Sequence, residues 1–430
     1  MPGRLNIFQR AMLRWDEMHP YNSAHMVQMA APLDGPRLRE TIRSTLAALG
    51  LGRLSISNDG RTYQYATPPA QAELKLLELG RDPLLDLTAE IERQLNTRFD
   101  RHAGFVPCRF FASAAKEGFY LGLIYFHPAA DGEAAVHLLR KLAEAYLGTG
   151  VPAAPLVIYP DRQDRWFHQS PGLLAGKFFS LFRLARNMRK SGRTRSANLL
   201  EARNAVSFFS LTQSEFAALA KAGKAWDATI NDLFLALLLK CILRLQADRP
   251  ASARRPWRSV GCIVNLRKDL ELDSPRTFGL FLGSFVVTHR GASEVGLREL
   301  ATAVRSETSR IKRGRLYLGA PLELAFARWW LGFLSGERRA RFYQTHFPLW
   351  GGISNMNLNP LWPGGGQGSV RDYFRAVSTG PATPLVLSLT SLGQRTNIGV
   401  SYLTAIYSAA DIEAVKQCFL ESVRALQPPP

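Results

Sequence analysis

The sequence predicts an α/β protein with two lobes, each of which mixes strands and helices. The chain has 430 residues, 46% hydrophobic and 21% charged, so it can bury two cores of ordinary domain size. Strand and helix periodicities occur in both halves, and a cation-rich stretch without acidic residues separates them. We therefore expect an N-terminal lobe over residues 1–165, a basic amphipathic connection over 166–203 and a C-terminal lobe over 204–430.

The first half contains a strand, a short loop and a helix in succession. Residues 36–49 have helical apolar spacing, and residues 119–126 form an apolar run of strand length. From Asp131, apolar residues recur every three and four positions until Gly148, where a helix is expected to end.

The second half resumes with alternating elements. A helix is expected to begin between Thr229 and Asp232. Strands are expected at 205–211, 259–266, 282–288 and 385–392.

The net charge of +19 predicts attraction to anionic partners, which include nucleic acid, anionic lipid, a phosphate-bearing cofactor and an acidic carrier protein. Charge alone does not choose among them. No zinc-finger, basic-zipper or RNA-recognition signature is present, so we do not expect nucleic acid as a partner.

The four cysteines are far apart and none belongs to a C-x-x-C pair, which predicts buried, reduced thiols and neither a zinc site nor a disulfide framework. The first twenty residues carry charges and no apolar core segment, and the richest apolar run, 233–245, contains Lys240 and Arg244. We expect a cytoplasmic monomer, open to peripheral attachment at the inner membrane face.

The run FHPAADG, residues 126–132, carries the chemistry. Pro128 disfavours helix at His127, so the histidine is expected in extended geometry at the end of a strand, and Gly132 permits a tight entry into the following helix. The composition gives about 0.02 chance occurrences of H-x-x-x-D-G. The alternative is a structural histidine with Asp131 as an ordinary helix N-cap.

Four other segments accompany this motif in order: TINDLFLA at 229–236, VNLRK at 264–268, LGSFVVTHR at 282–290 and GGISNMNL at 351–358. Together they resemble the superfamily of chloramphenicol acetyltransferase, the condensation domains of peptide synthetases, plant H-x-x-x-D-G acyltransferases and wax ester synthases. The resemblance implies two chloramphenicol-acetyltransferase-like lobes in a V, with a central channel between them.

The resemblance also assigns roles to residues. The second histidine of the H-H-x-x-x-D-G motif, which is the family's base, corresponds to His127, and Asp131 would pair with Arg267 in a structural role. Phe126 replaces the first motif histidine, which makes peptide-bond formation on carrier proteins less expected. It also keeps open a non-catalytic relative that binds acyl carriers or lipids.

A neutral imidazole is well matched to take a proton from a hydroxyl or amine that attacks a thioester. The donor would be an acyl thioester of coenzyme A or of a phosphopantetheine carrier protein, with no permanently bound cofactor and no metal. Ser354 and Asn355 are candidate oxyanion donors, with a plain turn as the alternative. Phe126 is expected in the substrate channel.

Two segments bear on the substrate. In residues 173–193, an apolar stripe and a cationic stripe are typical of a helix on an anionic membrane, and equally of a surface helix packed on the lobes. Residues 327–350 contain three tryptophans and several arginines. They predict a mouth for a lipophilic substrate or, alternatively, a buried helix that lines the channel.

Overall fold

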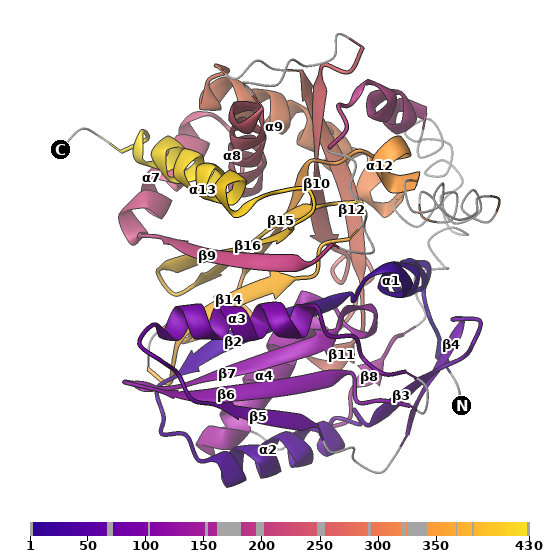
Figure 1. The fold of residues 1–430 in the computed structure, drawn as a ribbon, viewed down its shortest axis with the longest axis vertical. Helices are drawn as coiled ribbons and strands as arrows, with labels where there is room; N and C mark the ends of the chain where they lie inside the picture. The colour runs from indigo at the N-terminus through magenta and orange to yellow at the C-terminus, as the bar shows by residue number, and fades with distance from the viewer. Residues whose placement is uncertain are drawn as a thin grey trace.

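The protein was analysed as a computed structural model, in which two lobes lie one above the other (Figure 1). The structure describes residues 3–66, 72–101, 104–150, 154–160, 182–194, 202–246, 254–290, 294–319, 324, 333, 342–366, 368–380 and 382–427. Each lobe has its own sheet and its own hydrophobic core. The predicted α/β class with two lobes is confirmed.

The sheet of the N-terminal lobe has five strands in the order β14–β2–β7–β6–β5. Neighbours are antiparallel except β5 and β6, which are parallel. The strands are β2 (Asn22–Met29), β5 (Glu73–Leu77), β6 (Cys108–Ala115), β7 (Gly118–Phe126) and β14 (Val370–Val377). The helices of this lobe are α2 (Gly35–Ala48), α3 (Pro83–Leu95) and α4 (Gly132–Leu147).

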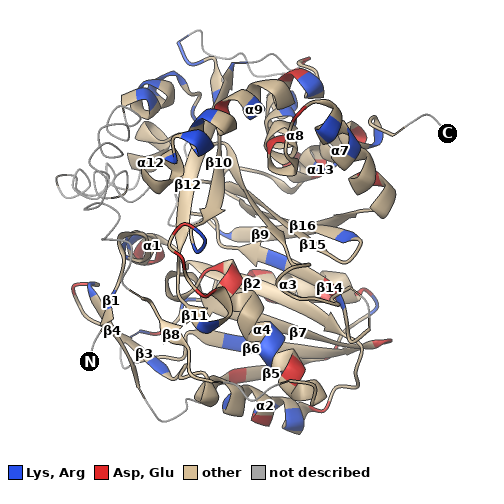
Figure 2. Cartoon of the chain, turned by 180° about the vertical axis from the view of Figure 1, so that it is seen from behind, with Lys and Arg blue, Asp and Glu red and all other residues tan. Residues whose placement is uncertain are grey.

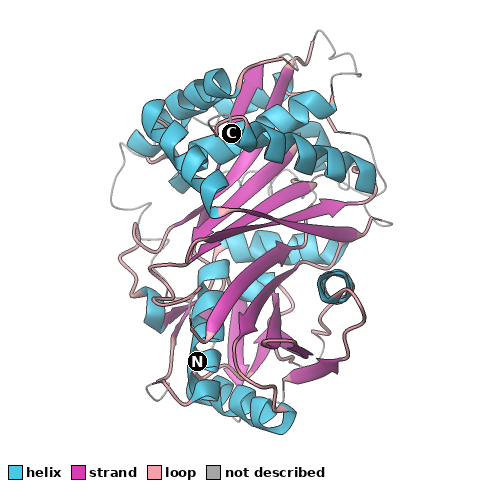
Figure 3. Ribbon diagram, turned by 90° about the vertical axis from the view of Figure 1, so that its left-hand side faces the viewer, coloured by secondary structure: helices cyan, strands magenta, loops and turns pink. Residues whose placement is uncertain are grey.

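The sheet of the C-terminal lobe has six strands in the order β12–β10–β13–β15–β16–β9 and mixes parallel with antiparallel pairs. Its helices lie on the side of the sheet that faces away from the N-terminal lobe (Figure 3). The strands are β9 (Asn204–Leu211), β10 (Trp257–Asn265), β12 (Leu282–Arg290), β13 (Gly351–Asn357), β15 (Leu385–Leu392) and β16 (Arg395–Leu403). The helices are α7 (Gln213–Ala225), α8 (Ile230–Leu245), α9 (Leu297–Arg313) and α13 (Ala409–Arg424).

Smaller elements lie outside these two sheets. Helix α1 begins at a capping box on Asn6, whose side-chain amide also donates to the carbonyl oxygen of Leu280 at 2.8 Å. The short strands β8 and β11 pair in parallel. These elements are α1 (Ile7–Met18), α12 (Phe342–His346), β1 (Gly3–Arg4), β3 (Arg53–Ile56), β4 (Thr62–Ala66), β8 (Val157–Ile158), β11 (Thr277–Phe278) and the 3-10 turns His127–Ala129, Ser274–Arg276 and Leu316–Gly319.

Strand β14 is the strongest link between the lobes. It comes from the range predicted as the C-terminal lobe, 204–430, yet it pairs antiparallel with β2 at the edge of the N-terminal sheet. It also packs against β15 and β16 of the other sheet. The second half of the chain therefore supplies one strand to the first sheet. A period-2 pattern predicts a strand but not the sheet that receives it.

Most of the predicted elements are present, and local sequence explains their ends. Helix α4 begins at the N-cap Asp131 and ends at Gly148, whose φ of 70° suits glycine. Helix α8 begins at a capping box formed by Thr229 and Asp232. All four cysteines are buried and free, as predicted.

One local prediction is wrong. His127 is not extended but begins a 3-10 turn, His127–Ala129, directly after β7. Pro128 is tolerated there because the first turn of a helix needs no N–H from its second residue. The turn is closed by a hydrogen bond of 3.3 Å from Ala130 N to His127 O.

The two segments predicted to contact substrate are only partly described. Residues 182–190 form a helix, and residues 173–181 lie outside the described residues, as do most of 327–341. Lys and Arg are distributed over both lobes, with Asp and Glu among them (Figure 2). No helix in the described part of the chain is both long and apolar enough to cross a membrane.

The contact between β16 and β14 gives a test of this arrangement. A Cβ at Gly399 would overlap the carbonyl oxygen of Arg375, whereas a Cβ at Gly261 would meet only Leu349 Cδ1 at 3.5 Å. We expect Gly399→Ala to lower the free energy of unfolding by about 1–3 kcal/mol through overpacking. We expect Gly261→Ala, in the same sheet, to change it by less than about 0.5 kcal/mol. Urea denaturation measures both, and equal midpoints would contradict the packing of β14 on β16.

Candidate functional site

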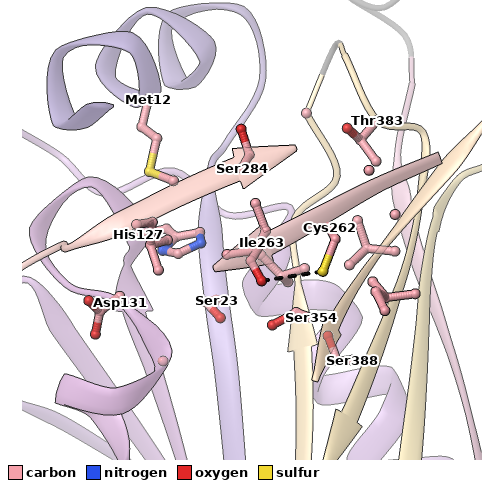
Figure 4. A pocket seen from close by; sticks show the side chains of 18 of the residues that line it. Met12, Ser23, His127, Asp131, Cys262, Ile263, Ser284, Ser354, Thr383 and Ser388 are labelled. Carbon is pink, nitrogen blue, oxygen red and sulfur yellow. Dashed lines mark hydrogen bonds between the residues drawn. The ribbon is translucent and has the colours of Figure 1, made fainter. Parts of the chain in front are cut away.

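A cavity of about 250 Å³ lies between the lobes, and side chains from both of them line it. Figure 4 shows His127 and Asp131 on one side and Ser354, Cys262 and Ser388 on the other. The N-terminal lobe contributes residues from α1, β2, β7, the 3-10 turn and α4, and the C-terminal lobe contributes residues from β10, β12, β13 and β15. A group bound here would be enclosed by both sheets.

His127 enters this cavity from the turn that follows β7. Its ring Nδ1 lies 3.0 Å from the carbonyl oxygen of Ala130. Because a carbonyl oxygen only accepts, this contact assigns the proton of the neutral ring to Nδ1 and leaves the Nε2 lone pair without a proton. The side chain is 9% exposed, so little water competes for it.

The surroundings of His127 favour its neutral form. The ring stacks on Tyr21, with centroids 5.5 Å apart and an interplanar angle of 11°, and Tyr125 meets it edge-on. Burial lowers the pKa of His127 below 6.5, although the hydrogen bond to Ala130 and the charge of Asp131 oppose this shift. The imidazole is therefore neutral, and able to accept a proton, at pH 7.

Asp131 is bound on every side and cannot take part in proton transfer without disrupting the site. Its Oδ1 accepts from Ala134 N at 3.0 Å as the N-cap of α4, and its Oδ2 accepts from Arg267 Nη1 at 2.6 Å and from Phe281 N at 2.9 Å. Asp131 and Arg267 are 1% and 3% exposed. One carboxylate thus begins a helix of one lobe and holds a loop of the other.

Gly132 occupies a tightly packed position, where an added Cβ would require the end of the Met356 side chain to shift. A Cβ there would lie 2.9 Å from Met356 Cε and 3.5 Å from Arg375 Nη1. The glycine allows the first turn of α4 to approach β13 and β14 closely, so it forms part of the cavity wall.

Ser354 and Asn355 lie in strand β13, which excludes the turn that was the alternative to a functional role. Successive side chains of a strand point to opposite faces. Ser354 Oγ accepts from Arg375 Nη1 at 3.3 Å, on the side of the N-terminal lobe. Asn355 Nδ2 donates to Asn231 Oδ1 at 2.6 Å, at the start of α8. The two predicted oxyanion donors are therefore oriented differently.

Metal binding has little support in this site. Within the described ranges, no group of three or more His, Cys, Asp or Glu side chains is placed to hold a metal ion. Glu133, a carboxylate of the cavity wall, accepts from Asn265 and Ser274. The site is suited to proton transfer and hydrogen bonding.

Comparisons with known proteins support the fold. No family model matches the chain. The first condensation domain of the calcium-dependent antibiotic synthetase, in complex with a substrate analogue, is 15% identical with a TM-score of 0.73, over 98% of this chain and 95% of that one. Polyketide synthase associated protein 5 from Mycobacterium tuberculosis is 14% identical with a TM-score of 0.68, over 99% and 98% of the chains. The condensation domain of the Monacolin K polyketide synthase MokA is 14% identical with a TM-score of 0.67, over 99% and 97%.

This chain has the condensation-domain fold. The resemblance seen in the motifs is thereby extended to the whole two-lobed architecture. One curated protein, the probable non-canonical nonribosomal peptide synthetase CymA of Salinispora arenicola, is 32% identical over 137 residues. That match covers 31% of this chain and 2% of the length of CymA.

The prediction that Phe126 lies in the channel of this condensation-domain fold is wrong. Its side chain is fully buried in the core of the N-terminal lobe, against Phe99 and Phe105, and it is not among the described residues that line the cavity. Phe126 is the last residue of β7 and points to the face opposite His127. The position of the first motif histidine is thus a packing position here.

Several cavity residues could not be predicted from the sequence. Tyr21 directly precedes β2, His25 lies within β2, and Arg375 lies in β14. His25 is buried between Tyr373 and Tyr125, and burial together with the charge of Arg375 lowers its pKa well below 6.5. No motif marks these residues, because they reach the site only through strand pairing.

The buried Asp131–Arg267 pair gives the second prediction. Arg267→Ala leaves the carboxylate buried and uncompensated, so we expect the free energy of unfolding to fall by about 3–5 kcal/mol, and Asp131→Asn to be damaging for the converse reason. Arg14→Ala, which breaks the exposed pair with Glu17, should change it by no more than about 1 kcal/mol. Chemical denaturation followed by circular dichroism measures these changes, and equal effects of the two arginine variants would contradict the structural role of the pair.

Proposed function

We propose that this protein is an acyltransferase that moves an acyl group from a thioester to a hydroxyl or amine, in secondary-metabolite or lipid biosynthesis. The observation that carries the proposal is the state of His127, a neutral histidine whose Nδ1 is held by Ala130 O and whose ring lines a cavity between two lobes. The fold shared with condensation domains supports the same class of reaction.

In the proposed reaction, Nε2 of His127 accepts the proton of the acceptor as the acceptor oxygen or nitrogen attacks the thioester carbonyl. A tetrahedral intermediate forms, with the negative charge on the former carbonyl oxygen. The charge returns to re-form the carbonyl, the carbon–sulfur bond breaks, and the imidazolium gives its proton to the leaving thiolate. The Nδ1–H stays bonded to Ala130 O throughout, so the ring keeps its orientation.

The cavity offers groups for both charged species of this reaction. The face of Tyr21, parallel to the ring of His127, is suited to an imidazolium. The Ser354 hydroxyl is the proposed oxyanion donor, because it accepts from Arg375 and so keeps its own hydrogen for a ligand. Asn355 is a weaker candidate, since one of its amide hydrogens is taken by Asn231.

The proposed donor is an acyl group on coenzyme A or on the phosphopantetheine of a carrier protein. Both carry phosphate, and the helix 182–190 brings cations to the cavity, because Leu184 lines the cavity wall while Arg183, Arg186 and Lys190 are exposed. We further propose that this basic helix attaches to an anionic membrane and that the acceptor is lipophilic.

The central test is the removal of His127. We expect His127→Ala to lower turnover about 100- to 10,000-fold, the range for one general base, with little change in thermal stability. Thioester consumption with a panel of amine and hydroxyl acceptors measures it. Wild-type protein that binds acyl thioesters but does not consume them, or a variant as active as wild type, would favour a non-catalytic binding protein.

The pH profile provides an independent readout of the same residue. Because burial places the pKa of His127 below 6.5 and only the neutral ring accepts a proton, kcat/KM should hold down to about pH 6.5 and decrease at lower pH. A decrease in kcat/KM with a midpoint above pH 7 would mean that a group other than His127 is titrating.

The basic helix gives a further prediction. Replacing Arg183, Arg186 and Lys190 with Gln should weaken binding to phosphatidylserine vesicles at low salt by about 1 kcal/mol per cation, without changing the fold. The matched control replaces Arg298, Lys312 and Arg313, which are exposed on α9 of the same lobe. Cosedimentation measures binding. If the wild-type protein does not bind such vesicles, the membrane is excluded as a partner. The phosphate of the acyl donor then remains as the partner of these cations.

A further inference from the structure

A second buried arginine lies in the cavity wall. Arg375 belongs to β14, is 5% exposed and lines the same cavity as His127. Burial lowers its pKa to about 10, so the guanidinium stays charged at neutral pH. A buried charge is costly unless an opposite charge or a full set of hydrogen bonds compensates it.

The hydrogen bonds of Arg375 are many but go only to neutral groups. Its Nε donates to Thr390 Oγ1 at 2.8 Å, and its Nη2 donates to the carbonyl oxygens of Ser354 and Leu389 at 2.7 and 2.6 Å. Its Nη1 donates to Ser354 Oγ at 3.3 Å. A guanidinium has five N–H groups, so one hydrogen on Nη1 remains, and none of the described residues accepts it.

Arg267 provides a comparison within the same cavity wall. It is equally buried, and Asp131 neutralises it at 2.6 Å. No described carboxylate lies within ion-pair distance of Arg375. The acidic groups of the wall are engaged elsewhere, Asp131 with Arg267, and Glu133 with Asn265 and Ser274. The fold therefore supplies a counter-ion for one buried arginine and leaves the other without one.

Nη1 of Arg375 lies at the cavity wall. Arg375 and Gly132 both line the cavity, and Nη1 lies 3.5 Å from the position that a Cβ on Gly132 would take. The Ser354 hydroxyl accepts from Nη1 and keeps its own hydrogen for the oxyanion of the proposed reaction. The guanidinium therefore presents one remaining N–H, on a full positive charge, at the cavity wall. Charge-assisted hydrogen bonds of this kind are suited to carboxylates.

We propose that Arg375 binds a free carboxylate of the acceptor, placed a few bonds from the amine or hydroxyl that attacks the thioester. The acceptor is then a free acid, such as an amino acid or hydroxy acid, whose remaining side chain is lipophilic. An acceptor whose carboxyl group is itself tied to a carrier as a thioester has no such charge. The identification of the bound acid as the acceptor rests on the proposed acyl transfer. The carboxylate site itself is inferred from the geometry alone.

The test measures binding without turnover. Isothermal titration of wild-type protein with 2-hydroxy-4-methylpentanoate and with its amide compares two ligands that differ in the carboxylate. We expect the amide to bind about 10- to 100-fold more weakly, the range for hydrogen bonds to a charged group. This arm needs no variant, and equal binding of acid and amide overturns the proposal.

Variants assign the effect to Arg375. Arg375→Met should remove the preference for the acid, and Arg375→Lys should retain part of it. The control Arg371→Met removes an exposed cation of the same strand, which pairs with Glu117, and should keep the full preference. A preference that survives Arg375→Met in a folded variant overturns the assignment.

Two further measurements test whether Arg375 binds the acyl donor or the oxyanion instead. A dicarboxylic acyl thioester that is preferred over an uncharged one, without a preference between the acid and amide acceptors, would overturn the acceptor assignment. An equal loss of kcat with acid and amide acceptors in Arg375→Met would assign Arg375 to the oxyanion instead. In His127→Ala, the acid should bind as in wild type. Acid binding without any transfer by wild type would keep the carboxylate site and reject the acyltransferase.

Discussion

The Asp131 carboxylate ties the two lobes together beside the candidate site. It accepts the N-terminal hydrogen bond of α4 from Ala134, and it binds Arg267 and the backbone of Phe281 from the other lobe. The backbone N–H of Asp131 donates to the carbonyl oxygen of Gly279 at 3.0 Å. The turn that carries His127 ends directly before it. Because every contact lies in a buried region, the orientation of the imidazole and the docking of the two lobes depend on the same charge.

This dependence explains why the motif could be found in the sequence and its partner could not be derived from it. A histidine, an aspartate and a glycine within six positions encode a turn, an N-cap and a close approach, all of which are local. The position of Arg267 opposite Asp131, 136 residues later, depends on how two lobes dock. It was predicted only from the resemblance of VNLRK to a known family. Likewise, β7 and α4 follow from periodicity, whereas the place of β14 in the first sheet does not.

The same distinction separates the predicted site residues that line the cavity from the one that does not. His127, Asp131, Gly132, Ser354 and Asn355 all line the cavity, whereas Phe126 is buried in a hydrophobic core. A motif identifies the residue at a position but not the face on which its side chain lies. For Phe126, that face is set by its place as the last residue of β7. Tyr21, His25 and Arg375 have no sequence signal, because β2 and β14 carry other polar residues as well and no motif singles these three out.

The polar groups of the cavity form a chain from the base to the proposed anion site. Tyr125 meets both His127 and His25 edge-on, His25 bonds Tyr373, and the charge of Arg375 helps to keep His25 neutral. An anion bound at Arg375 would weaken that influence, and would leave the base itself neutral as long as the anion is not adjacent to it. The cavity can therefore hold a fixed negative charge near Arg375 and still present an unprotonated imidazole at His127. A base and a carboxylate placed directly together could not coexist so easily, because the carboxylate would favour protonation of the histidine. A carboxylate paired with the guanidinium of Arg375 has its charge offset there, so it favours protonation of His127 less than an unpaired carboxylate would.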